Sequence, residues 1–152
     1  MNQNDVHRPI ELLIFKLGEQ EYSLDIMCVR EIRGWTRATP MPLAPSYMRG
    51  VINLRGTVLP VMDLAERLGL PKCGQGERSV IVVVKHGGSM TGLLVDAVSD
   101  IVALNQDDLQ APPDGSLQDG PGVIRSLTVI GDRMVRILDL THIVAQPESD
   151  AA

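Results

Sequence analysis

The chain is poor in the residues that build metal sites, disulfides and stacked nucleic-acid surfaces. Its 152 residues include two cysteines, three histidines, one tryptophan, two tyrosines and one phenylalanine. Cys28 and Cys73 have no Cys or His neighbour at metal-ligand spacing, so we expect two reduced thiols rather than a disulfide. His7, His86 and His142 belong to no histidine cluster. We therefore expect no metal and no other cofactor.

Long apolar runs and basic runs are also missing. The formal charge is −5, with 14 Lys and Arg against 19 Asp and Glu, and this balance opposes binding to a nucleic-acid backbone. No apolar segment approaches the length that spans a bilayer, and residues 1–9 are polar, unlike a signal peptide. These features predict a cytoplasmic protein that neither binds nucleic acid nor inserts into a membrane.

What the chain does contain is a repeat. Leu12 to Ile32 can be laid on Ile81 to Ile101 without a gap, so that Val29 matches Val98. A second similarity links residues 50–52 with 122–124 and residues 58–64 with 134–140. Two similar modules predict a pseudo-symmetric molecule with a groove between its halves, where a partner can bind.

The local pattern of each module predicts short strands. Alternating apolar residues around a turn describe a hairpin at the start of each module. The strands that we expect are residues 11–17, 22–26, 29–35, 50–53, 57–62, 79–85 and 90–95, with short helices after Asp63 and Asp139. Pro40, Pro42 and Pro45 exclude a long helix before residue 46. We therefore expect an all-β chain of small antiparallel barrels or sandwiches whose modules share an apolar interface.

Two features go beyond ordinary strand alternation. Val80 to Val84 is continuously apolar, as in a strand covered on both faces, and we favour the other module over a partner protein as its cover. Glu31 and Arg55 are charged residues beside apolar positions. They either form a salt bridge on an exposed face or are unrelated surface charges.

The only candidate for catalysis is the pair Asp63 and Asp139. Each aspartate ends an apolar strand, as in the aspartic-protease plan, where two carboxylates share a proton. That mechanism needs Ser or Thr and then Gly after each aspartate, whereas Leu-Ala and Leu-Thr follow here. Helix capping is therefore the favoured interpretation, and an acid hydrolase is a remote alternative.

Four motifs of the chain occur together and in order. Residues 50–64 read Gly-Val-Ile-Asn-Leu-Arg-Gly-Thr-Val-Leu-Pro-Val-Met-Asp-Leu. The others are Phe-x-Leu-Gly-x-x-x-Tyr-x-Leu-Asp-Ile over residues 15–26, Val-x-Glu-Ile-Arg-Gly over residues 29–34, and Gly-Leu-Leu-Val-Asp-x-Val-Ser-Asp over residues 92–100. Together they closely resemble the family of the bacterial chemotaxis coupling protein CheW, over roughly residues 10–145.

This resemblance implies an all-β fold of two pseudo-symmetric five-stranded SH3-like β-barrels that share a hydrophobic core, with short helices. It places one CheW-like domain at residues 10–145, made of modules at about 10–72 and 73–145 that can exchange strands at the termini, with flexible tails at 1–9 and 146–152. Residues 110–122 are rich in Pro and Gly, and the resemblance leaves the contacts of this long loop open.

The resemblance also implies a function without catalysis. Members of the family are adaptors that link the cytoplasmic signalling tip of transmembrane chemoreceptors to the regulatory domain of the histidine kinase CheA. They act at the inner face of the membrane through receptor arrays, and assembly into rings or arrays is a further expectation. The same adaptor role in a parallel chemosensory pathway, which controls surface motility or second-messenger output, is the alternative.

Site residues follow from the motifs of the resemblance. It assigns receptor binding or signalling to Val29, Glu31, Gly50, Arg55, Gly92, Val98 and Ile101. Weaker candidates for the kinase side are Ile26, Gly56 and Ser79. Because receptor tips are helical, the resemblance implies that the groove receives a helix, with apolar anchors and a charged rim.

Overall fold

The computed structural model describes residues 9–71, 79–112 and 123–144. The tails, Cys73, the junction between the modules and most of the loop at 110–122 lie outside these residues. The strands are β1 Ile10–Leu17, β2 Gln20–Asp25, β3 Val29–Gly34, β4 Met48–Leu54, β5 Thr57–Asp63, β6 Val80–His86, β7 Ser89–Val95, β8 Ala97–Leu104, β9 Ile124–Ile130 and β10 Arg133–Leu138. The helical turns are η1 Ile26–Cys28, α2 Leu64–Arg67, η2 Gln106–Asp108 and α3 Leu140–Val144.

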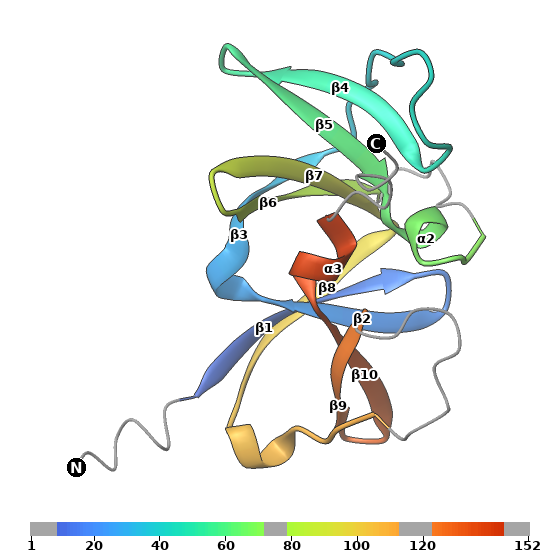
Figure 1. The fold of residues 1–152 in the computed structure, drawn as a ribbon. Helices are drawn as coiled ribbons and strands as arrows, with labels where there is room; N and C mark the ends of the chain where they lie inside the picture. The colour runs from blue at the N-terminus through green and yellow to red at the C-terminus, as the bar shows by residue number, and fades with distance from the viewer. Residues whose placement is uncertain (1–8, 72–78, 113–122, 145–152) are drawn as a thin grey trace.

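The ten strands form two sheets of five. Sheet A has the order β8-β1-β2-β10-β9, and sheet B has the order β3-β6-β7-β5-β4 (Figure 1). Each sheet therefore takes a hairpin from one sequence repeat and three strands from the other, so the boundary of a sheet does not follow the boundary of a repeat. The parallel pairs β10 with β2 and β5 with β7 join the exchanged hairpins to their sheets. The predicted all-β class and the pair of SH3-like barrels are confirmed.

The two sheets repeat each other in detail. The ladder of β3 with β6 shifts register at Arg30, and the ladder of β1 with β8 shifts at the matching Ser99. Arg49 and Arg125 mark an equivalent pair of shifts on β4 and β9. Because β-bulges bend a strand and increase its twist, these shared positions help each sheet to curl into a barrel.

Short backbone bridges close each barrel outside the regular strands. In sheet B, Thr39 and Val51 exchange two hydrogen bonds of 2.8 and 2.9 Å. In sheet A, Gln110 and Leu127 exchange two hydrogen bonds of 2.8 Å. The segments that follow β3 and β8 thus cover the outer strands β4 and β9.

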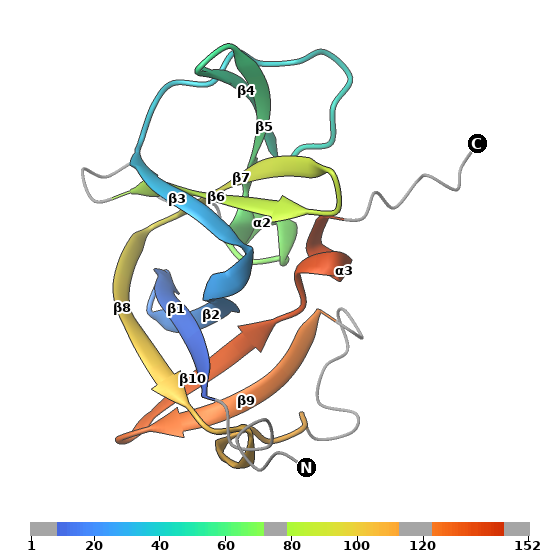
Figure 2. The same ribbon diagram turned by 90° about the vertical axis from the view of Figure 1, so that its left-hand side faces the viewer.

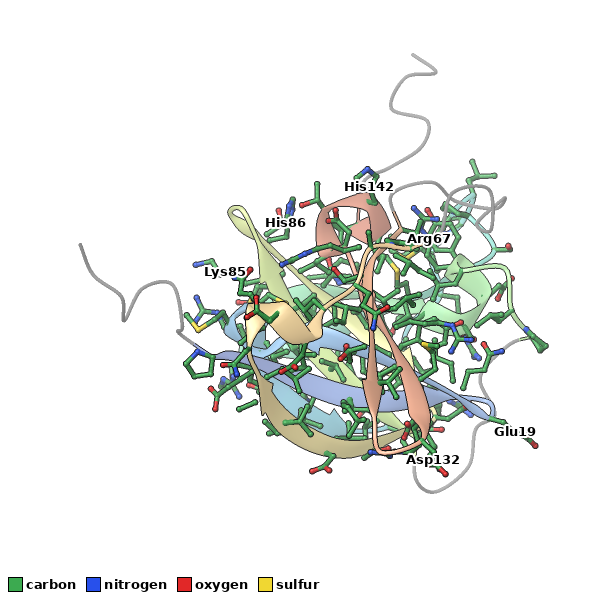
Figure 3. All side chains as sticks on the ribbon, turned by 90° about the horizontal axis from the view of Figure 1, so that it is seen from below. Glu19, Arg67, Lys85, His86, Asp132 and His142 are labelled. Atoms are coloured by element: carbon green, nitrogen blue, oxygen red, sulfur yellow. The ribbon has the colours of Figure 1, made fainter. Side chains whose placement is uncertain are left out.

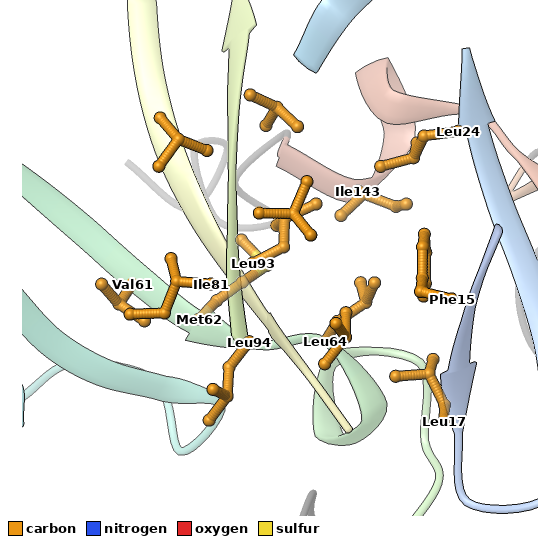
Figure 4. Close-up of a cluster of buried hydrophobic side chains, with 14 of the residues drawn as sticks. Phe15, Leu17, Leu24, Val61, Met62, Leu64, Ile81, Leu93, Leu94 and Ile143 are labelled. Atoms are coloured by element: carbon orange, nitrogen blue, oxygen red, sulfur yellow. The ribbon is translucent and has the colours of Figure 1, made fainter. Parts of the chain in front are cut away.

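The core lies between the sheets and is built from both. Strand β6 is buried on both faces, with Ile81 to Val84 at most 1% exposed, and the other module supplies the cover as expected. In Figure 4, Ile143 and Leu64 from the two short helices lie between Phe15 of sheet A and Leu93 of sheet B. The two barrels therefore share one hydrophobic core, which the resemblance implied.

Both short helices begin at an aspartate, as the sequence predicts. The carboxylate of Asp63 accepts a hydrogen bond of 3.1 Å from the Glu66 amide at the start of α2. The carboxylate of Asp139 accepts one of 3.0 Å from the Thr141 amide at the start of α3. Because these bonds satisfy amides that have no partner within the helix, each aspartate fixes where its helix begins.

Arg67 fastens helix α3 to the first half of the chain. Its guanidinium donates hydrogen bonds of 3.0 Å to the Ile143 carbonyl and 2.9 Å to the His142 carbonyl, and it lies 5.3 Å from the Tyr47 ring centroid. The other side of the helix is held by His86, whose Nε2 is 3.1 Å from the Thr141 hydroxyl (Figure 3). A cation at the C-terminal end of a helix also complements its dipole.

We expect Arg67→Ala to release α3 while the sheets persist. The loss of two charge-assisted hydrogen bonds costs about 1–3 kcal/mol at this partly exposed site, so amide hydrogen exchange should accelerate at His142 and Ile143. Arg67→Lys serves as the matched control, since it keeps the charge but cannot reproduce the two bonds of a planar guanidinium. Unchanged exchange in α3 for Arg67→Ala would contradict this role.

Candidate functional site

Four of the seven candidate receptor residues, Val29, Glu31, Val98 and Ile101, lie on the outer strands β3 and β8. Both strands lie on the side of the molecule turned toward the viewer in Figure 2. Val29 on β3 matches Val98 on β8, and both are half-buried. Ile32 and Ile101 match in the same way and are 43% and 54% exposed. We call these four residues the β3/β8 face. Val29 and Ile32 lie opposite Val84 and Val82 of β6, whereas Glu31 lies opposite Val83, so the Glu31 side chain points to the other side of β3. The sequence motifs did not assign a role to Ile32. Its alignment with the receptor candidate Ile101 could have predicted that it also lies on this surface.

A network of charges lies at the edge of sheet B. The Glu31 carboxylate accepts hydrogen bonds of 2.7 Å from Arg55 and 3.2 Å from Arg33. The pair Glu31 and Arg55 joins β3 to the turn between β4 and β5, which supports the salt-bridge interpretation over unrelated charges. The corresponding positions in the other repeat are Asp100 and Gly131, so sheet A has no equivalent of this pair.

Arg55 occupies a backbone conformation that its side chain does not favour. Its φ is 51°, and that of the following Gly56 is 86°, as in the two-residue turns that connect tight hairpins. The Gly56 amide donates a 2.9 Å hydrogen bond to the Asn53 side chain. A left-handed conformation costs a non-glycine residue about 1–2 kcal/mol. Arg55 accepts this cost at an exposed hairpin tip, where its side chain binds Glu31. Strained residues of this kind cluster at functional sites.

The two arginines also change the acidity of Glu31. Hydrogen bonding to Arg55, and then to Arg33, holds the pKa of the Glu31 carboxyl below its ordinary value. The carboxylate is therefore the form that the folded protein favours. The resulting stabilisation is present above the pKa of the unfolded chain and disappears as the pH falls through the lowered value.

Gly50 and Gly92 are positions where the fold has no room for a side chain. Gly50 has a φ of 137°, and a Cβ there would collide with the backbone carbonyl of Thr39. A Cβ on Gly92 would lie 2.8 Å from the Ile81 side chain and 3.3 Å from that of Val61. These glycines shape sheet B, and their own atoms are buried rather than presented on the β3/β8 face.

The weaker candidates for the kinase side do not form one surface. Ile26 is half-buried in η1, and Gly56 is exposed in the turn after Arg55. Ser79 is only 3% exposed, so its side chain is not presented to a partner.

The two aspartates that end β5 and β10 have separate environments. Asp63 is fully buried and holds Arg49 at 3.1 Å through one oxygen, while the other oxygen caps α2. Asp139 pairs with His142 at 3.2 Å and caps α3. Both aspartates therefore have structural roles that account for their carboxylates without a shared proton.

Other reactive features are weak in the part of the chain that the structure describes. Burial, and then the charge of Asp25, raises the pKa of the Cys28 thiol to about 11, which disfavours the nucleophilic thiolate. Within the described ranges, no cluster of His, Cys, Asp and Glu is arranged to hold a metal ion. None of the described helices has the length and apolar character needed to span a membrane.

Comparison with known proteins agrees with this architecture. A family model for the CheW-like domain matches residues 11–148. The chain is 45% identical over 152 residues to the probable chemotaxis protein CheW of Rhizobium etli, covering all of this chain and 96% of that protein. It is 45% identical to the chemotaxis protein CheW of Rhizobium meliloti, covering 93% of this chain and 92% of that protein. The crystal structure of the scaffolding protein TtCheW from Thermoanaerobacter tengcongensis has a TM-score of 0.80 and 33% identity, covering 86% of this chain and 89% of that one.

We expect Arg55→Ala to raise the pKa of Glu31 toward its ordinary value, because Arg55 makes the shorter of its two hydrogen bonds. Arg33→Ala should raise the pKa by a smaller amount. Following the Glu31 carboxyl resonance by NMR during a pH titration measures both shifts. An equal shift for the two variants would contradict the dominant role of Arg55.

We expect Gly50→Ala to destabilise the fold by about 1–3 kcal/mol, since the new Cβ pushes against backbone that closes sheet B. Chemical denaturation should show the loss, and hydrogen exchange should locate it at Thr39 and Val51. Gly18→Ala is the matched control, because that glycine also has a positive φ but open space around it. Similar losses in the two variants would show that backbone strain, rather than the collision, is responsible.

Proposed function

Because the chain belongs to the CheW-like family, whose members are chemotaxis scaffold proteins, we propose that it is a non-enzymatic adaptor that couples transmembrane chemoreceptors to the histidine kinase CheA. The observation that carries this proposal is the β3/β8 face, which presents apolar residues of both repeats, together with the ion pair of Glu31 and Arg55 at the edge of sheet B. That combination suits binding of a protein surface, and the family is not a catalytic one. An acid hydrolase is not supported, because the carboxylates of Asp63 and Asp139 cap helices.

We assign the receptor's signalling tip to the β3/β8 face. A helical hairpin presents apolar residues at intervals of three and four, which can contact Ile32 on one strand and Ile101 on the other. The half-buried Val29 and Val98 widen the apolar area. Glu31 with Arg55 lies at the edge of sheet B, where charges set orientation and exclude other partners more than they add affinity.

The regulatory domain of CheA, which has the same double-barrel form in this family, is the second proposed partner. Ile26 and Gly56 are the two accessible candidates for that contact, and because they do not form one surface, each marks a separate place where it can occur. Ring or array assembly needs contacts at both ends of the molecule. Val58 and Met134 occupy equivalent positions near the tips of two hairpins at opposite ends of the ribbon (Figure 1), and they are 67% and 49% exposed. The adaptor would then act in the cytoplasm at the inner face of the membrane, within receptor arrays.

A parallel chemosensory pathway is the less favoured version of this role. The relatives that match nearly the whole chain carry names of chemotaxis proteins, which supports chemotaxis proper. Swimming and surface spreading of a deletion strain separate the two: a defect confined to surface spreading would favour the parallel pathway.

The proposal predicts that Arg55→Ala weakens receptor-dependent control of the kinase without unfolding the protein. An exposed ion pair contributes only about 0–1 kcal/mol, so the melting curve should stay close to that of the wild type. Pull-down with the kinase regulatory domain and with a receptor signalling fragment, followed by a coupled kinase assay, measures the effect.

Arg133→Ala is the matched control for this experiment. Arg133 forms a 2.8 Å ion pair with Glu21 in sheet A, away from the β3/β8 face, and its loss should leave receptor coupling intact. Wild-type protein that binds neither partner would refute the adaptor role. Equal effects of the two variants would refute the assignment of Arg55.

A further inference from the structure

The open ends of the two barrels differ, although the sheets repeat each other. In sheet A, the segment between β8 and the bridge at Gln110 forms η2, and the Thr128 hydroxyl, which is buried, donates a 2.8 Å hydrogen bond to the Asp108 carbonyl. The chain therefore packs over the end of its own barrel. In sheet B, the equivalent segment runs from Trp35 to the bridge at Thr39 without a helical turn.

A cavity of about 260 Å³ lies beneath that segment of sheet B. Val61, Ile81 and Leu94, each at most 2% exposed, lie at its base, and Trp35 and Pro40 are among its other lining residues. An apolar cavity of about 150 Å³ is large enough to accept a benzene ring. The space therefore suits one large apolar side chain rather than an extended small molecule.

Arginines are the charged residues that line the cavity, although the complete chain has a formal charge of −5. Other arginines nearby in sequence have partners elsewhere: Arg33 and Arg55 bind Glu31, and Arg67 binds carbonyls of α3. Arg37 and Arg49 line the cavity, and Asp63 is buried against Arg49. An occupant with carboxylates beside its apolar group would therefore be attracted to this end of the barrel.

Trp35 gives the cavity the character of a protein-binding site. It is 41% exposed, and it stands beside arginines. Tryptophan and arginine are the residues most enriched among those that dominate binding energy at protein interfaces. An apolar group that enters the cavity would cover the exposed part of this indole and displace water from it.

We propose that the open end of the sheet B barrel is a docking site for an acidic segment of a partner protein, which inserts one large apolar side chain between Trp35 and the base of the cavity. A flanking carboxylate of the segment pairs with Arg37. This site is separate from the β3/β8 face and uses none of the residues assigned above to the receptor or the kinase. It gives the adaptor a third contact, specific for short acidic segments with an aromatic or aliphatic anchor.

The probe for this site is the blocked peptide acetyl-Glu-Glu-Phe-Glu-Glu-amide, titrated into the isotopically labelled full-length protein. Because Trp35 is the only tryptophan in the chain, its indole N–H gives a single NMR signal for the cavity. We expect a saturable shift of that signal and of the amides from Thr36 to Ala38. A peptide with Ala in place of Phe should bind at least roughly threefold more weakly, as should the original peptide in high salt.

Variants at two positions distinguish the contribution of the cavity to peptide binding from the contribution of the charge. Ala38→Leu fills the cavity and should abolish the preference for Phe over Ala while the protein remains folded. Arg37→Gln should weaken binding of the acidic peptide, whereas Arg30→Gln, the same charge change at an exposed residue of β3 that does not line the cavity, should have a smaller effect. Circular dichroism and thermal melting confirm the fold of each variant.

Several results would overturn the proposal. Equal binding of the Phe and Ala peptides would show that the cavity takes no side chain, and equal binding of a peptide with Lys in place of Glu would exclude the charge complementarity. Shifts of the Trp35 signal on raising the protein concentration alone would identify a second copy as the occupant, and shifts with anionic lipid vesicles but not with peptide would identify a membrane surface. None of these results affects the pull-down that tests the adaptor role.

Discussion

The burial of β1 and β6 on both faces is the constraint on which the rest of the structure depends. Leu12 to Phe15 and Ile81 to Val84 are each at most 1% exposed, so every second side chain faces the interior of a barrel and the others face the shared core. Full burial of one such aliphatic side chain stabilises the fold by about 1.5–3 kcal/mol. Because the hairpins carry these strands into the sheet of the other repeat, neither barrel has a complete core without its neighbour.

The functional surface follows from where this symmetric scaffold departs from symmetry. The repeats place Val29 and Ile32 on β3 and their counterparts Val98 and Ile101 on β8, which gives two similar apolar strips. Only sheet B adds Glu31 and Arg55, and, among the described residues, the segment after β3 lacks the helical turn that η2 forms in the segment after β8. Symmetry thus supplies the area for contact, and the asymmetric charges give the molecule one orientation toward its partners.

Much of the local structure could be predicted from sequence, because it depends on neighbouring residues. The alternation of apolar residues located the hairpins, and Asp63 marked the start of α2 through its capping hydrogen bond. The exchange of hairpins could not be predicted in this way, since a period of two fixes which face of a strand is buried but not which strand pairs with it.

The same limit applies to individual contacts between residues that are distant in sequence. The partners of Arg67 lie more than seventy residues away, and the obstacle to a side chain at Gly50 is the backbone carbonyl of Thr39. Ser79, a weaker candidate for the kinase side, lies outside the four motifs and has a buried side chain, because the residues that cover it are distant in sequence.

The exchange of hairpins also sets the order in which the molecule can be completed as it leaves the ribosome. All five strands of sheet B have been synthesised by Val95, whereas β1 and β2 must wait for β8 and β10, which end at Leu138. During that interval the apolar faces of the first hairpin have no sheet of their own, and such surface invites aggregation. The N-terminal hairpin, made first, is thus among the last elements to be enclosed, and the growing chain depends on sheet B to shelter one of its faces.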